Sequence, residues 1–276
     1  MIKVLFNVEY LVFYSFLKAI NKERKNIENL FLCIGKIDAA ISTASLKAGN
    51  LKICTPTFNE NNELKVSEIY HPLIDNCITN NVHLSQKSML LTGSNMSGKT
   101  TFIRTVAVNS ILAQTLNICF ARSYSAPFYK IYSSIRITDD LLDNTSYYLQ
   151  EVLRVKELID VSKSKNPCLF VLDEIFKGTN TIERISGGKA ILSYLNKEKH
   201  TVLVSTHDIE LTELLVKDNY DLYHFSEQIE ENNLFFDHKI KPGKLKTRNA
   251  IKILDLYKYP SEIIKEAKEI ETSNFS

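Results

Sequence analysis

The chain has 276 residues, of which 44% are hydrophobic and 24% charged, with a formal net charge of +2. Only 8 glycines and 6 prolines are present, which excludes collagen-like and low-complexity proteins and leaves one large folded domain, alone or with an appendage. The five cysteines are widely spaced and form no C-x-x-C pair, a pattern that disfavours zinc and disulfides and indicates reduced thiols in the cytoplasm.

The first predicted element is a helix over residues 7–48. Apolar residues from Ile27 to Ile41 recur at spacings of three and four, and Gly49 follows at the position of a helix C-terminal cap. The most apolar run, residues 8–20, includes two charged residues. It is too short to span a bilayer and lacks the flanks of a signal peptide, so we expect a core helix and no membrane partner.

The remainder of the chain alternates apolar runs with helical stretches. Predicted strands fall at residues 51–54, 66–70, 89–92, 168–172 and 201–205. Continuous Val, Leu and Ile runs separated by helices are typical of strands buried on both faces of a parallel sheet. We therefore expect the α/β class, with a largely parallel sheet flanked by helices. A hairpin is predicted from residues 222–225 and 234–240, followed by two helical stretches, the second beginning at Pro260.

The most specific motif follows the predicted strand 88–92 and precedes a predicted helix. Residues Gly93 to Thr100 read G-S-N-M-S-G-K-T, which matches the phosphate-binding pattern G-x4-G-K-[ST]. The backbone N–H groups of such a loop form an anion nest, and a Cβ at Gly93 or Gly98 would obstruct the turn or the phosphate. Lys99 then reaches the β- and γ-phosphates, and the Thr100 hydroxyl binds Mg²⁺. The alternative is a chance match in a strand-to-helix turn. The predicted nucleotide-binding residues here are Gly93, Ser94, Asn95, Met96, Ser97, Gly98, Lys99, Thr100 and Thr101.

Two further strands end in polar side chains suited to phosphate chemistry. The apolar run 168–172 ends in Asp173 and Glu174. Asp173 would hold Mg²⁺ directly or through water, and Glu174 would polarise the attacking water. The alternative is a strand that ends in a solvated acidic turn. The run 201–205 presents His207, which either contacts the γ-phosphate and orients the water or is a structural histidine.

The order and spacing of these elements resemble the ATPase domain of the MutS family, the DNA mismatch-repair proteins within the wider class of ABC-type ATPases. The likeness covers most of the chain after residue 70. The segments that carry it are Tyr70-His71-Pro72, Ser94-Asn95-Met96-Ser97, Asp139-Asp140-Leu141 with Ser146-Tyr147-Tyr148 and Glu151, Asp173-Glu174-Ile175 with Gly178-Thr179, and Ser205-Thr206-His207. The resemblance implies a P-loop NTPase domain of ABC-ATPase type over residues 51–276. Residues 1–50 then resemble the end of the MutS core, or lever, domain.

The resemblance also implies ATP and Mg²⁺ as cofactors, ATP hydrolysis, and a homodimer with head-to-tail ATPase sites. Ser146 would reach the γ-phosphate bound by the other subunit, and would thus join Glu174, His207 and Lys99 among the catalytic residues. ATP would join the subunits, hydrolysis would release them, and DNA would be a partner. His238 falls where the family places an aromatic residue or histidine against adenine, with an exposed hairpin residue as the alternative. Ile78 matches a second base-contacting position.

The sequence departs from the family pattern at several positions. Ser94 replaces a proline, Ser97 replaces a glycine, and Phe176-Lys177 replaces Gly-Arg, which makes the chain similar to divergent MutS-related proteins. The mismatch-reading domain and the clamp helices of the family have no counterpart in these residues. Two alternatives stay open: an ABC-type ATPase that serves another machine, and a nucleotide-gated association module with little turnover.

Two other patterns have structural interpretations. Residues 185–189, I-S-G-G-K, resemble the signature of ABC transporters but follow Asp173 instead of preceding it, so we interpret them as a close-packed part of a helix. The basic cluster Lys239, Lys241, Lys244, Lys246 and Arg248 is interpreted as a solvated edge, with contact to DNA phosphates as the alternative.

Overall fold

The computed structural model describes residues 8–49, 52–94, 96–135, 147–176, 179–197, 199–230, 233–245 and 250–274. The chain divides into two compact units, residues 1–51 and residues 52–276, and each is described by itself. The candidate functional site described below belongs to the second unit.

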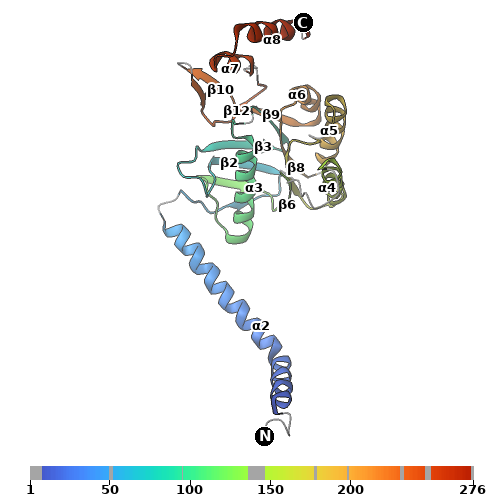
Figure 1. The fold of residues 1–276 in the computed structure, drawn as a ribbon. Helices are drawn as coiled ribbons and strands as arrows, with labels where there is room; N and C mark the ends of the chain where they lie inside the picture. The colour runs from blue at the N-terminus through green and yellow to red at the C-terminus, as the bar shows by residue number, and fades with distance from the viewer. Residues whose placement is uncertain are drawn as a thin grey trace. The chain divides into compact units, whose positions relative to one another are not determined.

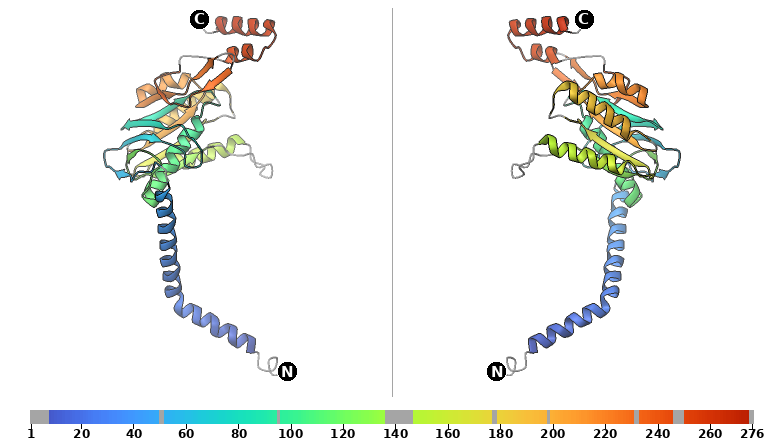
Figure 2. Two further views of the ribbon diagram at one scale, coloured as in Figure 1. Left: turned by 90° about the vertical axis from the view of Figure 1, so that its left-hand side faces the viewer. Right: turned by 90° about the vertical axis from the view of Figure 1, so that its right-hand side faces the viewer.

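The described part of the first unit is the helix α2, Val8–Ala48, which has 41 residues and bends along its length (Figure 2). It covers the predicted helix at 7–48, and the apolar run 8–20 is its first third. Phe13, Leu30 and other apolar side chains of α2 are exposed. By length and composition α2 could cross a membrane. A core helix of a soluble protein satisfies the same two criteria, so this helix does not place the chain in a membrane.

The second unit is built around a six-stranded sheet in the order β12-β9-β4-β8-β7-β6 (Figure 1). These strands are β4 (Ser88–Thr92), β6 (Lys130–Ser134), β7 (Cys168–Asp173), β8 (Thr201–Thr206), β9 (Tyr220–His224) and β12 (Lys241–Pro242). Every neighbouring pair from β9 to β6 is parallel, whereas β12 pairs antiparallel with β9. The strands predicted at 89–92, 168–172 and 201–205 are thus β4, β7 and β8.

A second sheet has the order β1-β5-β2-β3, in which β1 pairs parallel with β5 and the other pairs are antiparallel. Its strands are β1 (Thr57–Phe58), β2 (Glu63–Ile69), β3 (Asn80–Ser85) and β5 (Ser123–Ala126). The expected fold class was right as mixed α/β. The expectation of largely parallel strands was wrong for the molecule as a whole, because it holds for the central sheet and not for this one.

Two predicted β elements differ from the structure. The hairpin is formed by β10 (Glu227–Glu230) and β11 (Asn233–Phe236), whereas the predicted first strand at 222–225 lies mostly in β9 and pairs with β4. Periodicity identifies a strand but not its partner, which explains this error. The strand predicted at 51–54 is reduced, in its described residues, to an isolated bridge between Cys54 and Cys119.

Helices α3 (Lys99–Leu116), α4 (Tyr147–Val161), α5 (Thr181–Leu195) and α6 (Glu210–Leu215) cover the two faces of the central sheet. The 3₁₀ helix η1 (Val216–Asp218) follows α6, and α7 (Ala250–Leu256) packs against α8 (Ser261–Asn274). The two opposed views in Figure 2 show α3 on one side of the sheet and α4 and α5 on the other. Helix α5 begins after Asn180, whose side chain accepts a hydrogen bond from the N–H of Glu183.

Alternate side chains of the central strands enter two separate cores. Leu169 and Val171 pack in the core that contains α3 and the second sheet, whereas Phe170 and Leu172 pack with α4, α5 and α6. Each such buried side chain stabilises the fold by about 1.5–3 kcal/mol. Because both faces are covered, the strands are held in fixed register. The register places Asp173 opposite Ser205 at the carboxyl ends of β7 and β8.

Candidate functional site

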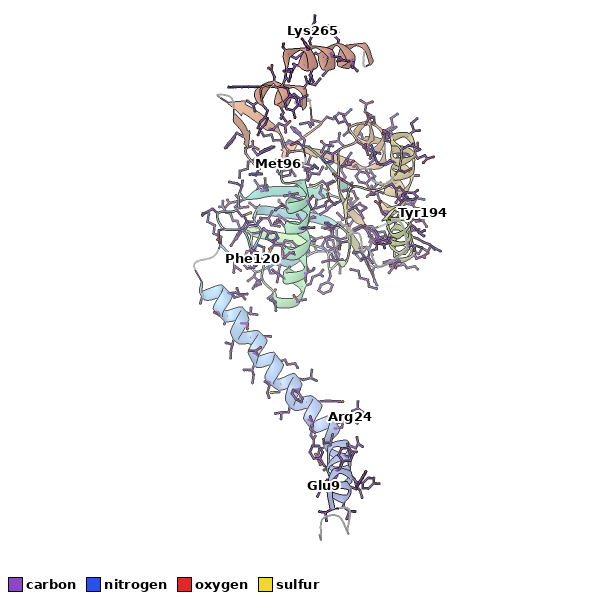
Figure 3. The ribbon with its side chains drawn as sticks, in the orientation of Figure 1. Glu9, Arg24, Met96, Phe120, Tyr194 and Lys265 are labelled. Atoms are coloured by element: carbon purple, nitrogen blue, oxygen red, sulfur yellow. The ribbon has the colours of Figure 1, made fainter. Side chains whose placement is uncertain are left out.

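The loop of residues 93–98 joins β4 to α3, so the predicted strand–loop–helix arrangement is present. Gly93 has a φ of +150° and Gly98 a φ of +105°, and both angles are rare for residues with a Cβ. A Cβ on Gly93 would lie 2.8 Å from Oγ of Ser97, and one on Gly98 would lie 3.3 Å from Nδ1 of His238. The two glycines are therefore required by the backbone and by close neighbours. Figure 3 shows Met96 at the end of the domain where α3 begins and Phe120 near the opposite end of α3.

The side chain of Lys99 is buried within this loop. Its Nζ donates hydrogen bonds to the carbonyl oxygens of Gly93 at 2.7 Å and Ser94 at 2.9 Å. The same ammonium lies 3.2 Å from Nε2 of His207 at the end of β8. Lys99 thus connects the loop after β4 with the neighbouring strand, at the position where an anion in the loop would lie.

Asp173 is held by hydroxyl groups from two other elements. Oγ1 of Thr100, at the start of α3, donates to Oδ2 of Asp173 at 2.8 Å, and Oγ of Ser205 donates to Oδ1. The sequence predicted Thr100 and Asp173 as metal ligands, and the structure brings their oxygens together. Ser205 was recognised only as part of a motif. Its place opposite Asp173 depends on strand register, which the sequence pattern does not give.

Glu174 follows Asp173 in a strained turn. Its φ is +55° and that of Phe176 is +59°, and each such conformation costs a non-glycine residue about 1–3 kcal/mol. The N–H of Glu174 donates to the carbonyl of Ser205 at 2.9 Å. Its Oε1 lies 2.6 Å from Nε2 of His207. These contacts aim the Glu174 carboxylate at the same histidine that Lys99 approaches.

A further residue supports this turn from α4. Glu151 is only 4% exposed, and its Oε1 accepts a hydrogen bond from the backbone N–H of Phe176. The Phe176 ring lies beside Tyr148, with 5.9 Å between the ring centroids. Glu151 belongs to a family-like sequence motif in which no role was predicted for it. In the structure, Glu151 and Tyr148 both connect α4 to the turn that carries Glu174.

A cavity of about 290 Å³ lies beside the loop. Ile78 and His238, the two residues predicted to contact adenine, both line it, together with Met96, Gly98 and Thr101. Nδ1 of His238 lies 3.0 Å from the carbonyl oxygen of Ser97. Because a carbonyl only accepts hydrogen bonds, Nδ1 carries the hydrogen in this contact. His238 is thus attached to the loop, although its side chain is exposed, and its contact with adenine stays a prediction.

Some predicted residues lie outside the described part of the chain. Asn95 and Ser146 are among them, as are the motif residues 139–141 and Gly178. The roles predicted for Asn95 and Ser146 stay predictions.

Residues 185–189 lie within α5, as their interpretation as part of a helix requires. Gly187 faces the Phe176 ring, since a Cβ there would lie 3.4 Å from two ring carbons. This contact allows α5 to approach the turn after Glu174.

The described lysines of the basic cluster have partners within the chain. Nζ of Lys239 donates to the carbonyl of Thr79 at 2.5 Å. Lys241 pairs with Asp237 at 2.6 Å and Lys244 with Glu213 at 3.2 Å. Lys246 and Arg248 lie outside the described residues. These ion pairs agree with the interpretation of the cluster as a solvated edge.

The domain is mixed α/β, and its β4, loop and α3 have the order and the G-x4-G-K-[ST] pattern typical of a phosphate-binding loop. A family model for MutS domain V matches residues 89–274. The chain belongs to the MutS family.

Curated relatives extend the match to nearly the whole chain. The DNA mismatch repair protein MutS of Aquifex pyrophilus is 30% identical over 274 residues, which are 95% of this chain and 32% of that protein. The proteins of the same name from Clostridium kluyveri and Staphylococcus aureus are 29% and 28% identical, over 96% and 95% of this chain and 32% and 31% of their own lengths. The chain spans about a third of the length of these relatives.

Proposed function

We propose that residues 52–276 bind ATP with Mg²⁺ and hydrolyse it, as a module of DNA mismatch repair or another DNA-maintenance process. The observation that carries this proposal is the convergence of Lys99, Asp173 and His207 from the ends of three adjacent parallel strands. In open α/β sheets, ligands bind at the carboxyl ends of the strands. The geometry therefore supports a phosphate site at this edge.

The phosphates would be held by the loop amides and by Lys99. The ammonium already lies inside the loop, bonded to the carbonyls of Gly93 and Ser94. Phosphate oxygens are stronger acceptors than neutral carbonyls. Binding would therefore need only a short movement of Lys99.

The oxygens of Thr100 and Asp173 suit Mg²⁺, which prefers hard oxygen ligands and retains several waters. They lie 2.8 Å apart, and the bond from Ser205 fixes the carboxylate orientation. When bound, Mg²⁺ would neutralise charge that develops on the phosphate oxygens during transfer.

Glu174 is the proposed base. It would accept a proton from the water whose oxygen attacks the γ-phosphorus, while the bond from that phosphorus to the bridging oxygen breaks and ADP leaves with the electron pair. His207 would hold the Glu174 carboxylate in place through the 2.6 Å contact and sense the γ-phosphate. Ile78 and His238 would contact adenine in the adjacent cavity.

We further propose a homodimer with head-to-tail sites, in which Ser146 reaches the γ-phosphate held by the partner, and DNA as the coupled ligand. Residues 1–50 would correspond to the end of the core domain and residues 51–276 to the ATPase domain. The names of the relatives support the connection to mismatch repair. The five free cysteines agree with a cytoplasmic location.

The test is an ATPase assay of the purified chain with and without DNA, combined with its oligomeric state with and without ATP. Turnover stimulated by DNA supports the proposal. ATP-driven dimerisation without turnover would replace it with a nucleotide-gated association module. An ATPase rate that is the same with and without DNA would favour an ABC-type ATPase that serves another protein assembly.

A further inference from the structure

We propose that Asn80 is a positioning residue for the nucleotide base, because its buried side-chain amide holds residues 238–240 against the cavity beside the loop. The inference rests on the proposed function and adds a residue that lines the cavity together with Ile78 and His238. Asn80 begins β3 and is 8% exposed.

The nitrogen and the oxygen of the Asn80 amide both form hydrogen bonds with residues 238–240. Nδ2 donates to the carbonyl of His238 at 3.0 Å, and Oδ1 accepts from the N–H of Ile240 at 2.9 Å. Nδ2 also lies 3.4 Å from the carbonyl of Ile78. One side chain therefore bridges the backbones of both residues predicted to contact adenine, which are 160 positions apart in the sequence.

The segment held in this way has a backbone that needs support. His238 has a φ of +49°, which is uncommon for a residue with a Cβ. Its ring lies against Phe236, with 6.0 Å between the ring centroids and 21° between the planes. The hydrogen bond of Lys239 to Thr79 is exposed, and the contact of Nδ1 of His238 with the carbonyl of Ser97 is partly buried. Buried hydrogen bonds with two engaged ends specify position more strongly than exposed ones.

Loss of the Asn80 amide would weaken the contacts with the base of the nucleotide and leave those with its phosphates. The carbonyl of His238 and the N–H of Ile240 would lose their buried partner, and the segment would shift away from β3. The His238 ring would then leave its place in the cavity. The Asn80 amide bonds to the backbones of Ile78, His238 and Ile240, whereas Lys99, which would hold the phosphates, bonds to the carbonyls of Gly93 and Ser94. The base contact should weaken while the phosphate contact is retained.

The experiment compares the affinities of the full chain for Mg-ATP and for inorganic tripolyphosphate, which lacks the base and the sugar. Asn80→Ala should weaken ATP binding by about tenfold, the effect of a lost buried hydrogen-bond partner. Its affinity for tripolyphosphate should match that of the unchanged chain. Asn80→Asp, which has the same shape but places a carboxylate against the His238 carbonyl, should show the same pattern and covers the case in which the alanine variant does not fold.

The matched control is Asn196→Ala. Asn196 also bridges two segments, through Oγ of Ser88 at 2.5 Å and the carbonyl of Asp218 at 2.6 Å, but at the opposite end of β4. This variant should lose stability and keep the wild-type ratio of ATP to tripolyphosphate affinity. In a His238→Ala background, Asn80→Ala should add little further loss, because the two residues act on one contact.

The outcomes separate the inference from the proposed function. If Asn80→Ala and Asn80→Asp leave the ratio of the two affinities unchanged, the positioning role of Asn80 is wrong while ATP binding stands. If the unchanged chain binds neither ligand, the proposed function is wrong and the inference is overturned with it.

Discussion

Nε2 of His207 lies 2.6 Å from Oε1 of Glu174. The same ring nitrogen lies 3.2 Å from Nζ of Lys99, so the imidazole stands between an acid and a cation. The three residues come from separate segments, the start of α3 and the ends of β7 and β8. A substitution of any one of them therefore alters the hydrogen bonding of the other two.

Glu174→Gln should keep ATP binding and abolish turnover. The amide has the shape of the carboxylate but does not accept a proton, and loss of a general base lowers the rate by about 10²–10⁴-fold. Phosphate release and nucleotide affinity, measured on the same preparation, check this expectation, and any ATP-dependent dimer should persist longer. Glu213→Gln, at an exposed pair with Lys244, is the control and should hydrolyse ATP normally. Undiminished turnover in Glu174→Gln would remove Glu174 from the mechanism.

Gly98→Ala should weaken ATP binding by about tenfold or more, since a left-handed backbone costs alanine about 1–3 kcal/mol. The new Cβ would also lie 3.3 Å from Nδ1 of His238. Titration with a fluorescent ATP analogue measures the loss. The matched control is Gly35→Ala in α2, where a Cβ meets nothing within 4 Å. That variant should bind ATP as before and gain up to about 1 kcal/mol of helix stability. Equal affinities in both variants would contradict the role of Gly98.

Glu151→Ala should slow hydrolysis with little change in ATP affinity, because it removes the acceptor for the N–H of Phe176 and loosens the turn that carries Glu174. The unpaired buried N–H should also destabilise the fold by about 1–3 kcal/mol. Glu151→Gln retains an acceptor oxygen and should recover most of the turnover. Steady-state kinetics and thermal unfolding of both variants check this. Glu157→Ala, at an exposed pair on the same helix, is the control. Failure of glutamine to recover turnover would mean that the hydrogen bond is not what matters.

Asp218 should contribute stability that depends on pH. The hydrogen bond from Ser193 and the nearby Lys189 lower the pKa of this carboxyl below its ordinary value. A carboxyl with a lowered pKa in the folded state stabilises the fold above its unfolded pKa of about 3.9, and the contribution is lost as the pH falls through the folded pKa. Asp218→Asn should therefore lower the free energy of unfolding near neutral pH, and the difference from wild type should disappear in strong acid.

Urea unfolding across that pH range measures the Asp218 effect. Ser193→Ala, which removes the hydrogen-bond donor, should reduce the pH dependence in the same direction. A difference between Asp218→Asn and wild type that stays constant into acid would contradict the assignment.

The central strands were predictable because both faces of β4, β7 and β8 are buried, which leaves continuous apolar runs in the sequence. The short strands β5 and β6 were not, because serine, lysine and tyrosine fill them and distant partners hold them in place. Propensity is weak in such segments, and tertiary pairing decides their structure.

The residues of the site also divide into those that local sequence patterns predict and those that they do not. The phosphate loop and the two acids follow local patterns, and the sequence located them. Asn80, Glu151 and Ser205 act through partners that are distant in the sequence, namely His238, Phe176 and Asp173. A side chain whose role is to hold another segment leaves no local pattern, so these contacts emerge only when the chain is folded.

The position of β4 has a consequence for how the chain is made. Residues 88–92 leave the ribosome more than a hundred positions before either neighbouring strand, because β8 and β9 span residues 201–206 and 220–224. Pairings of such long range form slowly, and an apolar strand that waits for them is prone to aggregate. Nascent chains stopped before residue 200 would carry the phosphate loop and the apolar strand β4 without the two strands that pair with it.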